Sequence, residues 1–193
     1  MINFSAELYL LISRFAQSTP EWVHSFADFG TDAGLLLFFA LFGWHAWRTR
    51  GTPGHRLALV APLAVIGAYL VSEVTKSLIR EDRPCRAVAG AAPIAECPAV
   101  GDWSFPSNHA TIAASCAIVL TVLWPRLAPA VIPLAMLMAF SRVFVGVHYP
   151  HDVAAGFVVG STVGLLLALL AVRLVGPPAA AAPAPRQLVA SRR

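Results

Sequence analysis

The sequence predicts an all-α protein that is integral to a membrane: a bundle of about five transmembrane helices preceded by an N-terminal interfacial helix. Of its 193 residues, 58% are hydrophobic and 12% are charged, and the mean hydropathy is +0.69, far from the average of soluble globular domains. A helix needs about 20 apolar residues to cross roughly 30 Å of hydrocarbon. Five such stretches lie near residues 22–47, 57–80, 106–124, 127–147 and 151–175.

Three segments depart from this pattern of clean spans. Asp28 and Asp32 lie in the opening turns of the first stretch. We therefore place that end of the stretch at the membrane interface. Residues 177–193 are rich in Pro and Ala and end in basic residues, a composition typical of disorder. We expect one domain over residues 1–176, followed by a disordered cytoplasmic tail over 177–193. Residues 3–17 are too short to span, and their apolar side chains at helical spacing predict a surface helix: Phe4, Leu8, Leu11, Ile12 and Phe15.

The orientation follows from the basic residues, which concentrate on the cytoplasmic side of membrane proteins. With five spans, eight of the 14 Lys and Arg residues fall on the side of the C-terminus and six on the other side, where all ten Asp and Glu residues also fall. The C-terminus is therefore expected in the cytoplasm, and the loops 81–105 and 142–151 outside. The first set is Arg48, Arg50, Arg56, Arg126, Arg173, Arg186, Arg192 and Arg193, and the second is Arg14, Lys76, Arg80, Arg83, Arg86 and Arg142.

Charge and cysteine content exclude some functions. The basic residues lie at segment ends and form no face with interleaved aromatic side chains, so no nucleic acid partner is expected. Three cysteines without a C-x-x-C pair argue against a structural zinc site or a dithiol redox centre. Cys85 and Cys97 lie in the same outer loop, whereas Cys116 lies within a span. We expect a Cys85–Cys97 disulfide, because such bonds persist in oxidising compartments; two unpaired thiols are the alternative.

Three short blocks place charged side chains and imidazoles at span ends, where ionisable groups are costly and usually functional. In the first, Lys76 and Arg83 are two helical turns apart and can point the same way, and Pro84 ends the segment. A Lys and an Arg that snorkel to the interface are the alternative. Glu73, one turn before Lys76, could orient that lysine by an i,i+3 pair.

The second block reads SFPSNHA. Pro106 suits the first turn of a helix and Ser104 could cap that helix. The free N–H groups of Ser107, Asn108 and His109 would then form an anion site at the helix N-terminus, with His109 placed to donate a proton. A capped helix start that happens to contain a polar His is the alternative.

The third block places Arg142 near the outer end of a span, His148 in the following turn and Asp152 just inside the next helix. A carboxylate four residues beyond an imidazole can reach back to its Nδ1–H and leave Nε2 free as a nucleophile. A buried His–Asp hydrogen bond that only ties the loop to the helix is the alternative.

Together the three blocks resemble the tripartite signature of the type-2 phosphatidic acid phosphatase superfamily, K-x-x-x-x-x-x-R-P, P-S-x-H and S-R-x-x-x-x-x-H-x-x-x-D. Asn108 departs from many members, which have Gly or Asp there, and this bears on the substrate class rather than on the chemistry. Every specified position is filled in the expected order, by Lys76, Arg83, Pro84, Pro106, Ser107, His109, Ser141, Arg142, His148 and Asp152.

The resemblance implies a two-step hydrolysis without a metal or cofactor. His148 would attack phosphorus to form a phosphohistidine, and Asp152 would orient it. His109 would protonate the leaving oxygen and then activate water. Four residues would hold the phosphoryl oxygens, namely Lys76, Arg83, Ser107 and Arg142. Arg80 and Arg86 flank this set and could reach a second phosphate, or form a solvated rim.

By the same resemblance, the expected substrate is a lipid phosphate. Small bacterial members with this layout often act on undecaprenyl diphosphate outside the cell membrane, which makes it the lead substrate and recycling of the cell-wall carrier the lead function. Phosphatidylglycerophosphate, phosphatidate and other polyprenyl-linked phosphates are alternatives. Vanadium haloperoxidases share the anion-binding residues but are soluble, and a non-enzymatic membrane scaffold would not need the full signature. No feature of the sequence assigns an oligomeric state.

Overall fold

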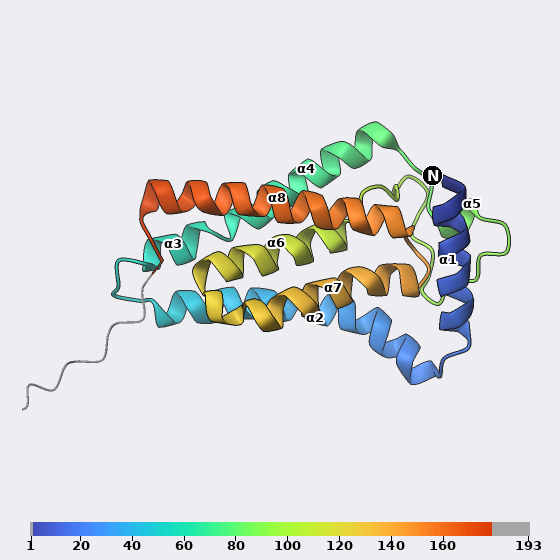
Figure 1. Ribbon diagram of the computed structural model, residues 1–193, viewed down its shortest axis with the longest axis horizontal. Coiled ribbons are helices and arrows are strands. Elements are labelled where there is room, and N and C mark those ends of the chain that lie inside the picture. Colours follow the sequence, from blue (N-terminus) through green and yellow to red (C-terminus); the bar gives the residue numbers. More distant parts are fainter. Residues whose placement is uncertain (1, 179–193) are drawn as a thin grey trace, which may run out of the picture.

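The computed structural model describes residues 2–178, and within these residues it contains helices and loops but no strand (Figure 1). This confirms the all-α prediction. Residues 179–193, most of the predicted tail, lie outside the described part of the chain. The elements are α1 (Ile2–Gln17), α2 (Glu21–Arg48), α3 (His55–Val60), α4 (Leu63–Ile79), α5 (Pro84–Ala87), α6 (Asn108–Leu123), the 3-10 helix η1 (Pro125–Leu127), α7 (Ala128–Phe144) and α8 (Pro150–Val175).

Four helical segments of the described chain are long and apolar enough to cross a membrane, and the shorter apolar helix α6 accompanies them. Two of the predicted spans have other helix boundaries in the structure than the sequence predicted. The span near 57–80 is divided into α3 and α4 by a turn at Ala61 and Pro62, because proline has no N–H to donate to a continuous helix. The span near 106–124 begins only at Asn108. The four segments are Glu21–Arg48, His55–Ala87, Pro125–Phe144 and Pro150–Val175.

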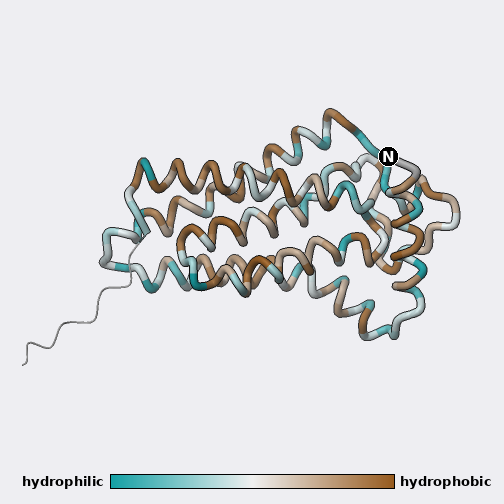
Figure 2. Tube along the Cα trace, viewed as in Figure 1, coloured by the Kyte–Doolittle hydropathy of each residue, from teal (hydrophilic) through white to brown (hydrophobic). Residues whose placement is uncertain are grey.

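The outer surfaces of the bundle helices carry the apolar side chains that a bilayer requires. Figure 2 shows hydrophobic residues along the helices and hydrophilic ones concentrated towards the two ends of the bundle. Because such side chains would be unfavourable in water over so large an area, this distribution supports a multi-pass membrane protein. Large side chains that point outward from the bundle include Leu36, Phe39, Leu70, Leu78, Met136, Leu137, Leu166 and Leu170.

Helix α6 lies at the centre of the bundle, in contact with α2, α4, α7 and α8. Its closest partner is α8, which turns a row of three glycines, Gly156, Gly160 and Gly164, towards it. A side chain at Gly160 would collide with the backbone of Thr111, and one at Gly156 with the carbonyl of Ser107. Small residues spaced four apart let two helices approach closely in a membrane. This contact sets the position of the α6 N-terminus against the first turn of α8.

Helix α1 crosses one end of the bundle, beside the loop that joins α5 to α6 (Figure 1). The Tyr9 hydroxyl donates to the carbonyl of Gly146 at 3.0 Å, and the Ser13 hydroxyl donates to that of Ala92 at 3.0 Å. Phe4 and Leu11, predicted to lie on the apolar face, are exposed on the opposite side of the helix. The protein-facing side carries the buried residues Ser5, Tyr9, Ser13 and Ala16, and Phe4 and Leu11 point outward, as expected for a helix at a membrane surface.

Candidate active site

The predicted nucleophile and its carboxylate meet in the turn between α7 and α8. His148 and Asp152 are both buried, and Nδ1 of His148 lies 3.3 Å from Oδ2 of Asp152. The backbone N–H of Tyr149 donates to the same oxygen at 2.8 Å. Asp152 lies in the first turn of α8, so its carboxylate reaches back over the helix start, as the spacing of four residues predicts. The pair leaves Nε2 of His148 facing the basic side chains.

Ser104 belongs to this cluster, although the sequence suggested a different place for it. Its hydroxyl donates to Oδ2 of Asp152 and lies 3.4 Å from Nδ1 of His148. The prediction that Ser104 caps the following helix is wrong, because that helix begins at Asn108 with Ser107 as its N-cap. A fully buried carboxylate needs donors, and Ser104 supplies one of them.

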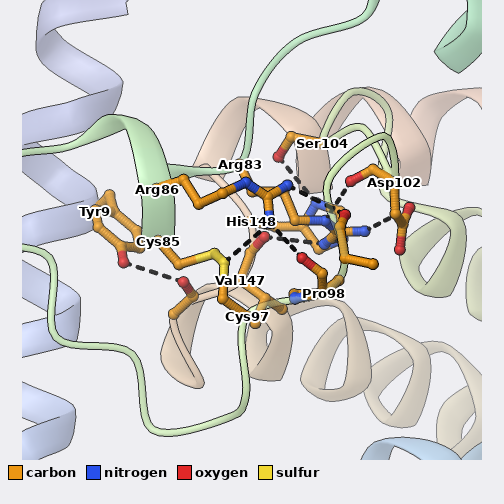
Figure 3. Close-up of a disulfide and its surroundings, with 12 residues drawn as sticks. Tyr9, Arg83, Cys85, Arg86, Cys97, Pro98, Asp102, Ser104, Val147 and His148 are labelled. Carbon is orange, nitrogen blue, oxygen red and sulfur yellow. Dashed lines mark hydrogen bonds and ion pairs between the residues drawn. A yellow bond between two sulfur atoms is a disulfide. The ribbon is translucent and has the colours of Figure 1, made fainter.

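The guanidinium of Arg83 joins the His148 region to the loop that precedes α6. Its Nη1 donates to the carbonyl of Val147 at 3.1 Å and lies 3.0 Å from Nε2 of His148. Its Nε donates to the carbonyl of Asp102 at 2.8 Å, and its Nη2 lies 2.9 Å from Oδ1 of Asp102. Figure 3 shows Arg83 extended between Asp102 and His148.

Lys76 and Arg83 point to the same place, but not as two turns of one helix: α4 ends at Ile79, Arg80 has a positive φ, and Arg83 precedes α5, which Pro84 begins rather than ends. Nζ of Lys76 lies 3.2 Å from the Oδ1 atom of Asp102 that also binds Arg83. Burial by itself would raise the pKa of the Asp102 carboxyl, but its hydrogen bonds and charge interactions with Arg83 and Lys76 outweigh that effect and hold the pKa below its usual value. No local sequence pattern marks Asp102 for this position.

The environment of His148 keeps its imidazole neutral. Burial lowers its pKa well below the usual 6.5, and the positive charges of Arg83, Arg142 and Lys76 lower it further. A neutral imidazole that presents Nε2 to a ring of cations can act as a nucleophile towards an anionic phosphoryl group.

Arg142 completes the basic residues around His148. Its carbonyl accepts the backbone N–H of Val147 and of His148, each at 3.2 Å. Its buried Nε has no hydrogen-bond partner among the described residues, and neither does the buried hydroxyl of Ser107. Buried donors rarely stay unpaired, so these two atoms mark positions for the oxygens of a bound anion. We refer to Lys76, Arg83 and Arg142 as the basic cage.

His109 lies in the first turn of α6, as predicted, and its partner comes from α2. Nε2 of His109 lies 3.2 Å from Oδ1 of Asp32. Asp32, predicted only to lie at the membrane interface, is thus a part of the site that its sequence position does not reveal. The predicted anion site at the helix start is reduced by one donor, because the N–H of Ser107 donates to the carbonyl of Asp152 at 3.1 Å. This bond ties the starts of α6 and α8 together.

The remaining polar side chains near the site have other partners than the sequence suggested. Glu73 does not pair with Lys76; it accepts a hydrogen bond from the side-chain amide of Asn108. Ser72 donates to the other end of that amide at 2.7 Å. Asn108 is therefore fixed by α4, which explains how the residue that departs from the family pattern is accommodated. Nε of Arg80 donates to the carbonyl of Ser77 at 2.9 Å.

A disulfide closes the loop beside the basic cage. Cys85 and Cys97 are bonded, with their Cα atoms 6.0 Å apart, which confirms the predicted pairing, and Cys116 is free and buried. The guanidinium of Arg86 donates to the carbonyl of Pro98, so it is bound within the loop (Figure 3). The disulfide thus joins the chain two residues after Arg83 to the chain five residues before Asp102.

One group of described residues has the composition of a metal site. Donor atoms of Glu81, His151 and Asp152 lie within 4.8 Å of one another. Nε2 of His151 lies 3.1 Å from each Glu81 oxygen and 3.3 Å from Oδ1 of Asp152. Nε2 of His151 hydrogen-bonds to the carboxylate of Glu81, whereas Oδ1 of Asp152 has no hydrogen-bond partner among the described residues. Nδ1 of His151 contacts Ser5 of α1 at 2.7 Å.

This site combines a buried His–Asp pair, a basic cage and a second histidine at one end of an apolar helical bundle. Such a set can bind a phosphoryl group and transfer it through a histidine, which defines a membrane-bound phosphatase. The model of the PAP2 superfamily matches residues 57–175, and the chain belongs to this superfamily. It is therefore an integral membrane hydrolase of lipid phosphate esters.

Characterised relatives are similar over most of the chain. An undecaprenyl-diphosphatase of Sulfolobus acidocaldarius is 29% identical in an alignment of 178 residues that covers 86% of this chain and 77% of that protein. The decaprenylphosphoryl-5-phosphoribose phosphatase of Mycobacterium tuberculosis is 34% identical over 143 residues, 73% of this chain and 74% of the relative. The crystal structure of a PAP2-type phosphatidylglycerolphosphate phosphatase from Bacillus subtilis superposes with a TM-score of 0.62 at 27% identity, covering 86% of this chain and 83% of that one.

Proposed function

We propose that this protein removes the terminal phosphate of a polyprenyl diphosphate, with undecaprenyl diphosphate as the lead substrate. The observation that carries the proposal is the contact of His148 Nε2 with a basic cage at the end of a membrane bundle. Two relatives are named for substrates on long polyprenyl chains, in Sulfolobus acidocaldarius and Mycobacterium tuberculosis. The products are inorganic phosphate and undecaprenyl phosphate, which recycles the cell-wall carrier lipid.

In the first step, Nε2 of His148 attacks the terminal phosphorus and the bond to the bridging oxygen breaks. The carboxylate of Asp152 holds Nδ1–H and stabilises the positive charge that develops on the ring. His109 gives a proton to the leaving lipid phosphate. The three phosphoryl oxygens, whose charge redistributes during the step, are bound by the basic cage and the hydroxyl of Ser107.

In the second step, water attacks the phosphohistidine and His109 takes its proton. Phosphate leaves, and His148 returns to its neutral form. This chemistry uses only side chains of the chain itself, so activity should persist in the presence of a chelator. Loss of all activity with EDTA, and its return with a divalent ion, would contradict a mechanism based on the basic cage alone.

We further propose that the site opens on the extracytoplasmic face of a bacterial cell membrane. Three observations support this: the distribution of basic residues, the one-sided acids, and the Cys85–Cys97 disulfide, which requires an oxidising compartment. An impermeant thiol reagent should label a cysteine introduced at Ala92 in intact cells, and should not label one introduced at Thr52. The reverse pattern would place the site in the cytoplasm.

Phosphatidylglycerophosphate is the second candidate substrate, because the Bacillus subtilis structure is similar over most of both chains. Phosphate release by the purified protein should be compared on undecaprenyl diphosphate, phosphatidylglycerophosphate and phosphatidate in the same detergent. The proposal expects the highest kcat/KM on the polyprenyl diphosphate. A preference of tenfold or more for phosphatidylglycerophosphate, about 1.4 kcal/mol in transition-state binding, would establish the second candidate instead.

A further inference from the structure

The basic cage is not open in this structure, because a carboxylate of the chain lies in it. Nζ of Lys76 and Nη2 of Arg83 converge on one oxygen, Oδ1 of Asp102, at 3.2 and 2.9 Å. The two cationic side chains are only 8% and 4% exposed, whereas that of Asp102 is 47% exposed. Two buried cations that share one oxygen define an oxyanion position, and its present occupant can reach solvent.

The other nitrogens of Arg83 cannot serve a phosphoryl group without losing structural bonds. Nε holds the carbonyl of Asp102, and Nη1 holds the carbonyl of Val147 beside Nε2 of His148. Nη2 is therefore the nitrogen of Arg83 that is committed only to a side-chain anion. A phosphate bound by both Lys76 and Arg83 needs the place that Oδ1 of Asp102 occupies.

We propose that Asp102 is a carboxylate plug, which occupies a phosphoryl-oxygen position of the basic cage in the free enzyme and leaves it when substrate phosphate enters. The proposal rests on the proposed function, because it assigns the cage to a phosphoryl group. Every anion that enters has to replace a carboxylate that is already bound to two cations, so Asp102 weakens the binding of all of them.

The surroundings of Asp102 allow its side chain to move while its backbone stays in place. The carbonyl of Asp102 remains bound to Arg83, and the N–H of Ser104 donates to the carbonyl of Glu81 at 2.7 Å. A polar cavity of about 450 Å³ adjoins the carboxylate. Rotation of one side chain into this space frees the oxyanion position without unfolding the loop. The cavity is lined by Glu73, Lys76, Ser77, Arg80, Gly101, Asp102 and Trp103.

A phosphomonoester or diphosphate displaces the Asp102 carboxylate from the basic cage more easily than a phosphodiester does. A terminal phosphate carries a charge of about −1.5 to −2 at neutral pH, and it offers three oxygens to the cage. A phosphodiester lipid carries a single negative charge, the same as the carboxylate that it would have to displace. The plug therefore keeps abundant phosphodiester headgroups out of a cage that would otherwise attract any anion.

The test is direct binding of small anions to the purified full-length protein, by isothermal titration calorimetry, with inorganic phosphate and dimethyl phosphate as probes. In Asp102→Asn the carboxylate is lost and the shape is kept, so both probes should bind at least about fivefold more tightly than to the wild type. Glu96→Gln, an exposed residue of the same loop, makes the same change in charge and should leave both dissociation constants unchanged within about twofold.

Phosphate binding to Asp102→Asn that is unchanged or weaker than in the wild type would overturn the plug, because Asp102 would then support the cage rather than compete for it. An equal gain in Glu96→Gln would also overturn it, because the effect would come from net charge. If Asp102→Asn does not fold, Asp102→Ser removes the same carboxylate and gives the same readout. Calorimetry needs no turnover, so a protein that hydrolyses no lipid diphosphate but passes this test would contradict only the proposed substrate.

Discussion

Asp32 on α2 and His109 on α6 lie side by side, with 3.2 Å between Oδ1 and Nε2. The two residues are 77 positions apart in the sequence. A carboxylate at one ring nitrogen fixes the tautomer and holds the ring in place. We therefore expect Asp32 to position the proposed general acid.

From this contact we predict that Asp32→Asn lowers kcat on a lipid diphosphate by about tenfold, a fraction of what a general acid contributes. Hydrolysis of p-nitrophenyl phosphate should change much less, because nitrophenolate leaves without a proton. Asp28→Asn, one turn earlier on α2, is the matched control and should behave as wild type. Equal losses on both substrates would mean that Asp32 only supports the structure.

Asp152→Asn should fold and lose most of its activity. The amide can still accept the N–H of Tyr149, but it cannot stabilise an imidazolium on His148, and we expect a decrease in kcat of about 10³- to 10⁴-fold. Ser104→Ala removes a donor to the same carboxylate and should cost far less. Melting curves of the wild type, Asp152→Asn and Ser104→Ala should accompany the kinetics, so that a loss of activity is separated from a loss of folding. A nearly normal rate for Asp152→Asn would make the His–Asp bond structural only.

The pKa of His148 predicts how pH affects both rate and stability. Because the folded protein holds this pKa well below 6.5, the nucleophile stays neutral at pH 6.5 and the acid limb of kcat/KM should lie below that value. The unfolded chain binds the proton first, so the contribution of His148 to stability is complete above pH 6.5 and is lost as pH falls towards the folded pKa. Melting temperatures between pH 8 and 5 should therefore fall more for wild type than for His148→Gln. Parallel curves would contradict the assignment.

The sequence predicts those parts of the site that are close together in the chain. His148 lies four residues before Asp152, at the start of α8, and this local spacing brings the two side chains together. Lys76 and Arg83 are also close in the chain, but α4 ends between them, so the loop rather than helical spacing brings their side chains together. Asp32 and Asp102 are different, because their partners come from other elements and no local pattern marks them. Ser104 was assigned to a helix cap because caps are local, whereas its partner Asp152 lies 48 residues away.

The contact between α6 and α8 belongs to the part that only the fold reveals, and it can be tested at Gly160. An added Cβ there would meet the backbone of Thr111, so Gly160→Ala should shift α6 against α8 and move His109 relative to His148. Misplacement by about 1 Å can cost roughly 100-fold in rate, and we expect a decrease in kcat of at least tenfold. Gly43→Ala on α2 meets no atom within 4 Å and is the control. An unchanged rate for Gly160→Ala would show that the two helices adjust without disturbing the site.

The disulfide should matter for substrate binding as well as for stability. It closes the loop that begins two residues after Arg83 and ends five residues before Asp102, so it limits how far the two partners of that ion pair can separate. In the chain-entropy model, a loop of this size contributes about 2–3 kcal/mol to the free energy of unfolding. We therefore expect Cys85→Ser/Cys97→Ser to melt several degrees lower and to have a higher KM, with a smaller effect on kcat, because His148 and Asp152 lie outside the loop. Cys116→Ala keeps the bond and is the control.

Mass spectrometry of non-reduced, alkylated protein must first show that Cys85 and Cys97 resist alkylation in the wild type. If both are alkylated without reduction, or if the double variant matches the wild type in KM and melting temperature, the disulfide does not organise the site.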